Sequence, residues 1–98
     1  MRMMLRFSMP NAAANAAIKD GSFQKTMEAT MARVQPEAAY FTADGGCRTG
    51  YLFFDMKDSS DMPPIAESLF MNLDARVEFQ PAMNGEDVKA GLAKAFTG

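Results

Sequence analysis

The chain has 98 residues, a length typical of one independently folding unit, so we expect a single domain over residues 1–98. Its net charge is −2 and its basic residues form no cluster, which argues against a nucleic-acid-binding protein. The single cysteine, Cys47, cannot form a disulfide framework within the chain and favours a reducing compartment. Residues 1–9 do not read as a signal peptide, and no apolar run is long enough to span a membrane. We therefore expect a cytoplasmic protein without nucleic-acid or membrane partners.

The first third of the chain predicts one strand followed by two helices. Residues 2–9 alternate between two sides, which is the pattern of a half-buried β-strand. Pro10 ends this strand, and an Ala-rich helix is expected from there to about Asp20. A second helix follows with Ser22 as a plausible N-cap, and Gln35-Pro36 ends it. Its apolar stripe has a spacing of about four residues and comprises Phe23, Met27, Met31 and Val34.

A β-hairpin in the middle of the chain is the clearest local signal. The segments Glu37–Ala43 and Cys47–Met56 are rich in strand-forming residues and are joined by Asp44-Gly45-Gly46. Glycines accept the positive φ angles that a tight hairpin turn requires. A two-residue loop at Gly45-Gly46 predicts three cross-strand pairs, which a looser loop would shift: Asp44 with Cys47, Thr42 with Thr49 and Tyr40 with Tyr51.

The last part of the chain predicts a helix, a strand and a second helix. The acidic and serine-rich turn at 58–61, followed by two prolines, is typical of a helix start. Residues 75–83 alternate as a strand, and Pro81 favours an edge position for it. Asn84 and Asp87 have nearly the spacing of a capping box and open a C-terminal helix. The apolar stripe expected on the helix that contains the two prolines comprises Met62, Ile65, Ala66, Leu69, Phe70 and Leu73.

The predicted order is therefore β, α, β, β, α, β and an added C-terminal helix. It predicts an α+β, ferredoxin-like βαββαβ fold with a four-stranded antiparallel sheet in the order 4-1-3-2. This topology places both main helices on one face of the sheet, where Gly50 is expected to admit a closely packed helix. The residues expected beneath the helices are uniformly apolar: Met3, Leu5, Phe7, Ala39, Phe41, Leu52, Phe54, Met56, Val77 and Phe79.

The opposite face of the sheet combines aromatic and charged side chains. Its aromatic area is large for a surface left in water, and its charges are too many for a dry core unless they pair. A pair between Arg6 and Glu78, or between Arg6 and Asp55, is geometrically possible. We interpret this face as a homodimer interface, and a partly solvated face or a ligand platform are the alternatives. Its members are Met4, Arg6, Tyr40, Thr42, Tyr51, Phe53, Asp55, Arg76, Glu78 and Gln80.

The chain resembles the dimeric α/β-barrel superfamily, and especially its small uncharacterised bacterial members. The features that carry the resemblance are the element order, the run 51–55 leading into the proline-started helix, and the closing strand 77–83 with its capped helix. The resemblance covers nearly the whole chain, although the superfamily shares no functional motif that can be placed on these residues. It implies that two sheets pack face to face across a two-fold axis, with any small-molecule pocket inside the barrel or between sheet and helices.

The absence of histidine is the strongest restriction on the chemistry. It removes the usual general base near neutral pH, the Ser/Cys–His nucleophile pair, and any His-ligated zinc, iron or haem. Cys47 could be an exposed thiol, but in a strand Arg48 points to the opposite face and cannot activate it. We therefore expect neither a cofactor nor a metal.

The best candidates for a pocket or an interface lie on the mixed face of the sheet: Arg6, Tyr40, Tyr51, Phe53, Asp55 and Glu78. A Tyr–acid or Arg–acid pair among them could orient a small organic anion or move a proton. No catalytic motif is identifiable, so the sequence favours a homodimeric barrel protein that binds a small hydrophobic molecule. The alternative is a cofactor-independent isomerase or monooxygenase acting on a small aromatic or hydrophobic compound.

Overall fold

The structure is a computed structural model that describes residues 1–97. Within these residues it contains four strands, four α-helices and one short 3-10 helix. Along the chain they are β1 (Arg2–Met9), α1 (Asn11–Asp20), α2 (Ser22–Val34), β2 (Ala38–Asp44), β3 (Cys47–Asp55), η1 (Ser59–Asp61), α3 (Met62–Leu73), β4 (Arg76–Pro81) and α4 (Gly85–Thr97).

The four strands form one open antiparallel sheet in the order β2-β3-β1-β4, which is the order 4-1-3-2 read from the other edge. All three hairpin pairs occur as predicted, among them Tyr40 opposite Tyr51. Pro81 lies in the edge strand β4, which has a neighbouring strand on one side only. A proline, which lacks the backbone N–H, is tolerated there because no strand on the outer side needs a hydrogen bond from it. The predicted α+β class is confirmed, and the arrangement is compatible with a ferredoxin-like fold.

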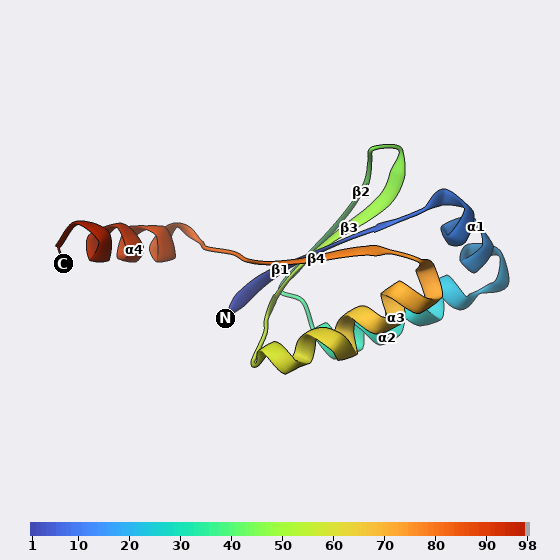
Figure 1. Ribbon diagram of the computed structural model, residues 1–98, viewed down its shortest axis with the longest axis horizontal. Coiled ribbons are helices and arrows are strands. Elements are labelled where there is room, and N and C mark those ends of the chain that lie inside the picture. The colour runs from blue at the N-terminus through green and yellow to red at the C-terminus, as the bar shows by residue number, and fades with distance from the viewer. Residues whose placement is uncertain (98) are drawn as a thin grey trace.

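Helices α2 and α3 pack side by side and cover one face of the sheet, and α1 lies at one end of this layer (Figure 1). No helix within residues 1–97 covers the other face, which we call the open face (Figure 1). The central strand β1 therefore buries one set of alternate side chains and leaves the other set uncovered. The edge strands β2 and β4 contain no fully buried residue. The open face is the one that the sequence predicts to be mixed.

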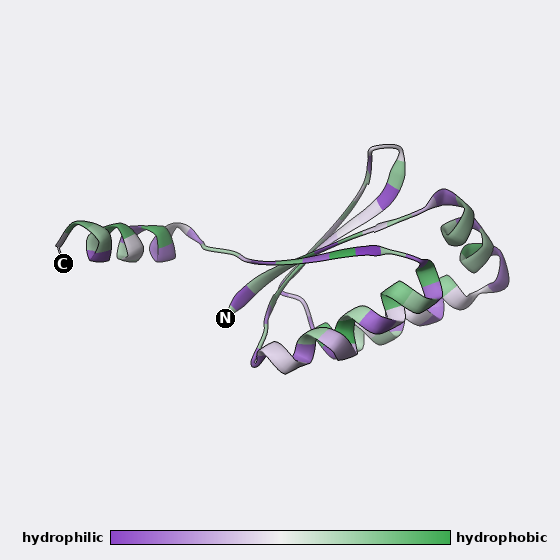
Figure 2. Ribbon diagram, viewed as in Figure 1, coloured by the Kyte–Doolittle hydropathy of each residue, from purple (hydrophilic) through white to green (hydrophobic). Residues whose placement is uncertain are grey.

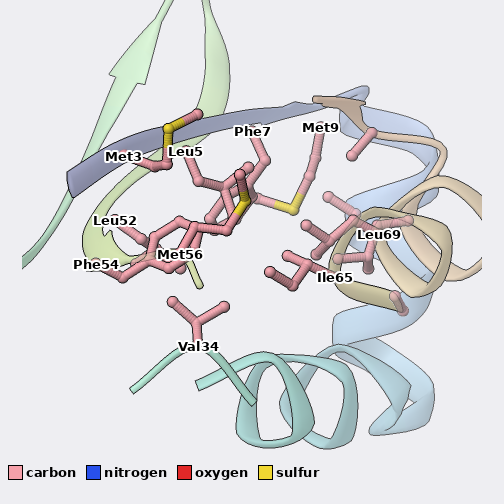
Figure 3. Close-up of a cluster of buried hydrophobic side chains, with 14 residues drawn as sticks. Met3, Leu5, Phe7, Met9, Val34, Leu52, Phe54, Met56, Ile65 and Leu69 are labelled. Carbon is pink, nitrogen blue, oxygen red and sulfur yellow. The ribbon is translucent and has the colours of Figure 1, made fainter. Parts of the chain in front are cut away.

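The hydrophobic core fills the space between the sheet and the helices (Figure 3). Strand residues such as Leu5, Phe7 and Leu52 meet helix residues such as Leu69, and all four are fully buried. One member of the predicted apolar face differs, because Phe41 is 58% exposed. Phe41 lies toward the turn of the hairpin, which extends beyond α2 and α3 (Figure 1).

Gly50 has a different role from the one that the sequence suggests. A Cβ atom built on Gly50 would lie only 2.4 Å from Cζ of Phe7, so the position accommodates the Phe7 ring rather than a helix. The two residues are cross-strand partners in β3 and β1, and a glycine there lets the fully buried ring lie over the backbone. The prediction of a close helix at Gly50 is therefore wrong.

Substitution of Gly50 by alanine is expected to lower the free energy of unfolding by about 1–3 kcal/mol, because the new methyl group overpacks the core against Phe7. Urea denaturation monitored by circular dichroism measures this change. The matched control is Gly91→Ala in α4, where nothing lies within 4 Å of the added Cβ. The Gly91→Ala control should leave the free energy of unfolding unchanged or raise it slightly. Equal losses of stability in the two variants would show that Gly50 is not needed to accommodate the Phe7 ring.

Helix caps follow the sequence in two of three cases. Asp58 and Asp61 form a capping box at η1. Asn84 and Asp87 exchange two hydrogen bonds at the start of α4, of 3.1 and 2.9 Å. The predicted cap at Ser22 is wrong, because Ser22 is already the first residue of α2 and its backbone N–H donates to Asp20 at 2.8 Å.

Helix α4 stands apart from the rest of the fold (Figure 1). It continues outward from the end of β4, and none of its described residues is buried. Hydrophobic and hydrophilic residues alternate along it, as Figure 2 shows. Within residues 1–97, no helix has both the length and the apolar character needed to cross a membrane.

Candidate functional site

Four side chains, one from each strand, lie at one level across the open face. They are Tyr40 on β2, Tyr51 on β3, Arg6 on β1 and Glu78 on β4, and the strand register places each opposite the next. We call these four residues the central row. Four of the six candidate residues predicted from the sequence are therefore brought together, across the whole width of the sheet.

Arg6 is the centre of the row's interactions. Its Nη2 donates to Oδ2 of Asp44 at 2.8 Å, and its Nη1 lies 3.5 Å from Oε1 of Glu78. Its Nε donates to the hydroxyl of Tyr51 at 3.4 Å, and the guanidinium carbon lies 5.9 Å from the centre of the Tyr51 ring. The predicted pair with Glu78 is thus confirmed, and Arg6 joins both acids and one tyrosine into a single network.

Asp44 is the functional residue that the sequence reasoning missed. The sequence places Asp44 at the start of the hairpin turn, opposite Cys47. It lies four residues after Tyr40 in β2, so its side chain points to the same open face. The hydrogen bond from Arg6 lowers the pKa of Asp44 below its ordinary value of 3.8, and the hydroxyl of Tyr51 lies 3.5 Å from the same carboxylate oxygen. The strand alternation would have found Asp44 if it had been continued into the turn.

Asp55 and Phe53 lie on the open face, but outside the central row. Phe53 faces Met4, one level away from Arg6, and Asp55 faces Arg2 at the next level. Asp55 pairs with the side chain of Lys57 and with the amino group of Met1, and these contacts lower its pKa to about 2. The predicted Arg6–Asp55 pair is therefore wrong, because the β1–β3 register separates the two residues along the strands.

A cleft of about 380 Å³ opens on the side of the central row that is nearer the hairpin turn. Arg76 and Ser8 are neighbours in the register and both line this cleft. Arg6 and the two acids that it pairs with, Asp44 and Glu78, line it as well. Within residues 1–97, no acidic side chain lies within 4 Å of the Arg76 guanidinium. A guanidinium beside a hydroxyl can bind a carboxylate or a phosphate through charge-assisted hydrogen bonds.

The arrangement suits binding better than proton transfer. A general base must accept a proton near the working pH, whereas Asp44 has a lowered pKa and is held by Arg6. Glu78 is paired with the same guanidinium. Across residues 1–97, no group of three or more His, Cys, Asp or Glu side chains is placed to hold a metal ion. The site therefore offers aromatic surface, a cationic anchor and a hydroxyl.

The Arg6–Asp44 pair should make stability depend on pH in a defined direction. The folded state lowers the pKa of Asp44, so the pair stabilises the fold above the ordinary pKa of 3.8 and the contribution is lost as the pH falls through the lower folded pKa. The stability difference between the wild type and Asp44→Asn should be constant from neutral pH to about pH 5 and should shrink below 3.8.

Urea denaturation at fixed protein concentration measures this difference. Glu67→Gln on α3 is a matched control, since within the described residues no basic side chain pairs with Glu67. A difference between the wild type and Asp44→Asn that persists unchanged to pH 2, or that matches the control at every pH, would contradict the role of this ion pair.

Comparisons with known proteins add no relative: no protein-family model matches the chain, and no curated protein or solved structure is significantly similar to it. The fold and the site by themselves define a class, which is a small α+β protein with an open four-stranded antiparallel sheet. Its uncovered face carries an arginine-centred row of aromatic and acidic side chains.

Proposed function

We propose that this chain is a homodimer of the dimeric α/β-barrel type, in which the open faces of two sheets pack together and enclose a site for a small organic anion with a hydrophobic body. The observation that carries the proposal is the central row on an uncovered face. Tyr40 is 66% exposed at the edge of this row, and Tyr51 and Phe53 are only half-buried. A second copy would remove this aromatic area from water.

The charges of the open face favour the same arrangement. Burying an unpaired charge in an interface is costly, whereas Arg6 already holds Asp44 and Glu78 within its own chain. The three groups would enter the interface with both ion pairs already made. This pairing reduces the free energy lost when the face leaves water, and it makes the mixed composition compatible with packing.

The cleft beside Arg76 is the best candidate for the ligand site. Its volume of about 380 Å³ lies within the range of small-molecule pockets, about 300–1,000 Å³. The open face of a second copy would cover it and turn an open cleft into a pocket. An anionic group would bind Arg76 and Ser8, and the apolar body would lie against Met9 and Pro10.

A cofactor-independent isomerase or monooxygenase is the less well supported alternative. Such an enzyme needs a group that takes a proton from its substrate, and both acids nearest the tyrosines are paired with Arg6. The same network that makes the face suitable for packing makes these acids poor bases. Binding without catalysis is therefore the function that the geometry supports best.

A matched ligand series tests the proposed site. Benzoate should raise the melting temperature of the protein, and benzyl alcohol, which has the ring without the charge, should raise it less. Arg76→Gln should weaken benzoate binding by about 10- to 100-fold, since a hydrogen bond to a charged group is worth roughly 1.5–3 kcal/mol. Isothermal titration calorimetry measures the affinities.

Arg33→Gln is the control for this series, because Arg33 lies on the exposed surface of α2 and does not line the cleft. It should bind benzoate as the wild type does. Equal affinity of Arg76→Gln and the wild type, or no stabilisation by any aromatic anion, would count against the site.

A further inference from the structure

Helix α4 carries an apolar stripe that has no partner within the described residues. Val88, Leu92 and Phe96 follow one another at four-residue spacing and are 41%, 55% and 84% exposed. Residues four apart lie on the same side of a helix, so the three side chains form one continuous stripe. An amphipathic helix normally buries such a stripe against another element, which implies that α4 has a partner.

The first turn of α4 is held so that the helix points away from its own fold. Asp87 closes the capping box with Asn84 and also accepts a hydrogen bond from Nη1 of Arg2 at 3.1 Å. Arg2 is itself held by Glu37 at 2.7 Å. These contacts tie the start of α4 to one end of the sheet, and the rest of the helix extends outward (Figure 1). The stripe is thus presented to another molecule.

The fold also contains an apolar groove at the hairpin end of the sheet. It has a volume of about 610 Å³ and lies on the helix-covered side of the hairpin, beside the first turn of α2. Met9, Phe23, Phe41 and Ala43 line it, with Arg48 among the polar residues. We call it the Phe41 groove, because Phe41 is 58% exposed there.

The stripe and the groove lie at diagonally opposite corners of the sheet. Helix α4 follows Pro81, which faces Met3 near the start of β1, whereas the groove includes Met9 at the end of β1. Six residues of strand separate Met3 from Met9, or about 20 Å. The two features also belong to opposite edges, since β4 leads to α4 and β2 carries Phe41.

We propose that α4 of each copy docks into the Phe41 groove of the other copy. This inference rests on the proposed homodimer and extends it. With two open faces stacked, a two-fold axis that lies between the sheets and is perpendicular to the line between the two corners brings the α4 corner of each copy to the groove corner of the other. The groove lies on the helix-covered side of the hairpin, so each α4 would pass around the β2 edge of the other copy to reach it. The contact is then made twice, in a closed arrangement, by the helix-in-groove mode of recognition.

The area available on the open face favours a second copy as the occupant. The three aromatic residues Tyr40, Tyr51 and Phe53 can bury about 450–750 Å² together, and two of them are already partly covered. A standard interface buries about 800 Å² on each partner. The stripe and the groove supply further apolar area, and exchange between two copies covers both features at once.

Three variants and one mixture test the exchange. The stripe variant is Leu92→Glu/Phe96→Glu, and the groove variant is Phe41→Glu. Both change exposed residues, so circular dichroism should show an intact fold. Each should raise the dimer Kd, measured by sedimentation velocity, by about 100-fold, since losing one buried apolar side chain costs roughly tenfold or more in affinity. The control, Ala90→Glu/Thr97→Glu, adds the same charge on the opposite side of α4 and should leave Kd within about threefold.

Mixing the stripe variant with the groove variant gives the decisive result. The groove variant still has an intact helix, and the stripe variant still has an intact groove, so their heterodimer retains one of the two docking contacts. Native mass spectrometry of an equimolar mixture should show heterodimer at well over twice the abundance of each homodimer, which is the ratio that random association gives. A wild-type dimer that the stripe variant does not weaken would overturn the exchange and leave the proposed homodimer standing. Weakened variants that gain nothing on mixing would overturn it as well, whereas a monomeric wild type would overturn both proposals.

Discussion

Substitution of Tyr40 by aspartate is expected to convert the dimer into a monomer at micromolar concentrations. Tyr40 is 66% exposed in the single chain and ends the central row, so the proposed interface buries it. The variant places an unpaired carboxylate in each copy's interface and removes an aromatic contact. A buried, unpaired charge costs several kcal/mol, which corresponds to an increase in the dimer Kd of about 1,000-fold or more.

The matched control for this variant is Met71→Asp. Met71 is 80% exposed and lies on α3, in the helical layer on the far side of the sheet from the open face. Both variants exchange an exposed apolar side chain for a carboxylate, so charge and solubility change in the same way. Sedimentation velocity should show a dimer for Met71→Asp and a monomer for Tyr40→Asp. An unchanged Kd for Tyr40→Asp would place the interface elsewhere.

Substitution of Phe7 by alanine is expected to cause the largest loss of stability of any substitution considered. Phe7 is fully buried at the centre of the core, and its ring fills the space that Gly50 leaves on the neighbouring strand. Removing a buried phenylalanine side chain typically costs about 3–5 kcal/mol, a large part of the roughly 5–15 kcal/mol that stabilises a small domain. Urea denaturation measures the change.

A double-mutant cycle with Gly50→Ala isolates the contact between these residues. In the wild type the added methyl group collides with the Phe7 ring, whereas in the Phe7→Ala background the space is free. Gly50→Ala should therefore be much less destabilising, or even stabilising, when Phe7 is absent. Met71→Ala serves as the control for surface truncation and should change stability by less than about 0.5 kcal/mol. Additive effects of the two core substitutions would contradict the assigned packing.

The elements of the fold could be predicted because each has a strong local signal. The alternation in residues 2–9, the Gly45-Gly46 turn and the capping pair Asn84 and Asp87 all depend on near neighbours in the sequence. The role of Gly50 could not be predicted, because it depends on how the Phe7 ring lies over another strand. The exposure of Phe41 likewise depends on where α2 and α3 end relative to the hairpin.

The site could be predicted only in part, for a related reason. The alternation of side chains along a strand assigns each one to a face, so the sequence predicts one shared face for Arg6, Tyr40, Tyr51 and Glu78, as the register confirms. The alternation does not give the level along the strand, which depends on the β1–β3 register. That register pairs Arg6 with Tyr51 and places Asp55 too far along the sheet to reach it. The network of Arg6 could therefore be recognised only once the strands were aligned.

The most direct test of the proposed dimer is the molar mass of the unmodified chain in solution. Size-exclusion chromatography with multi-angle light scattering, at protein concentrations from about 1 to 100 μM and at neutral pH, gives this mass without assumptions about shape. The packing of two open faces predicts twice the mass of one chain over the upper part of this range. A mass equal to one chain at every concentration would contradict it, because the aromatic central row would then remain in water.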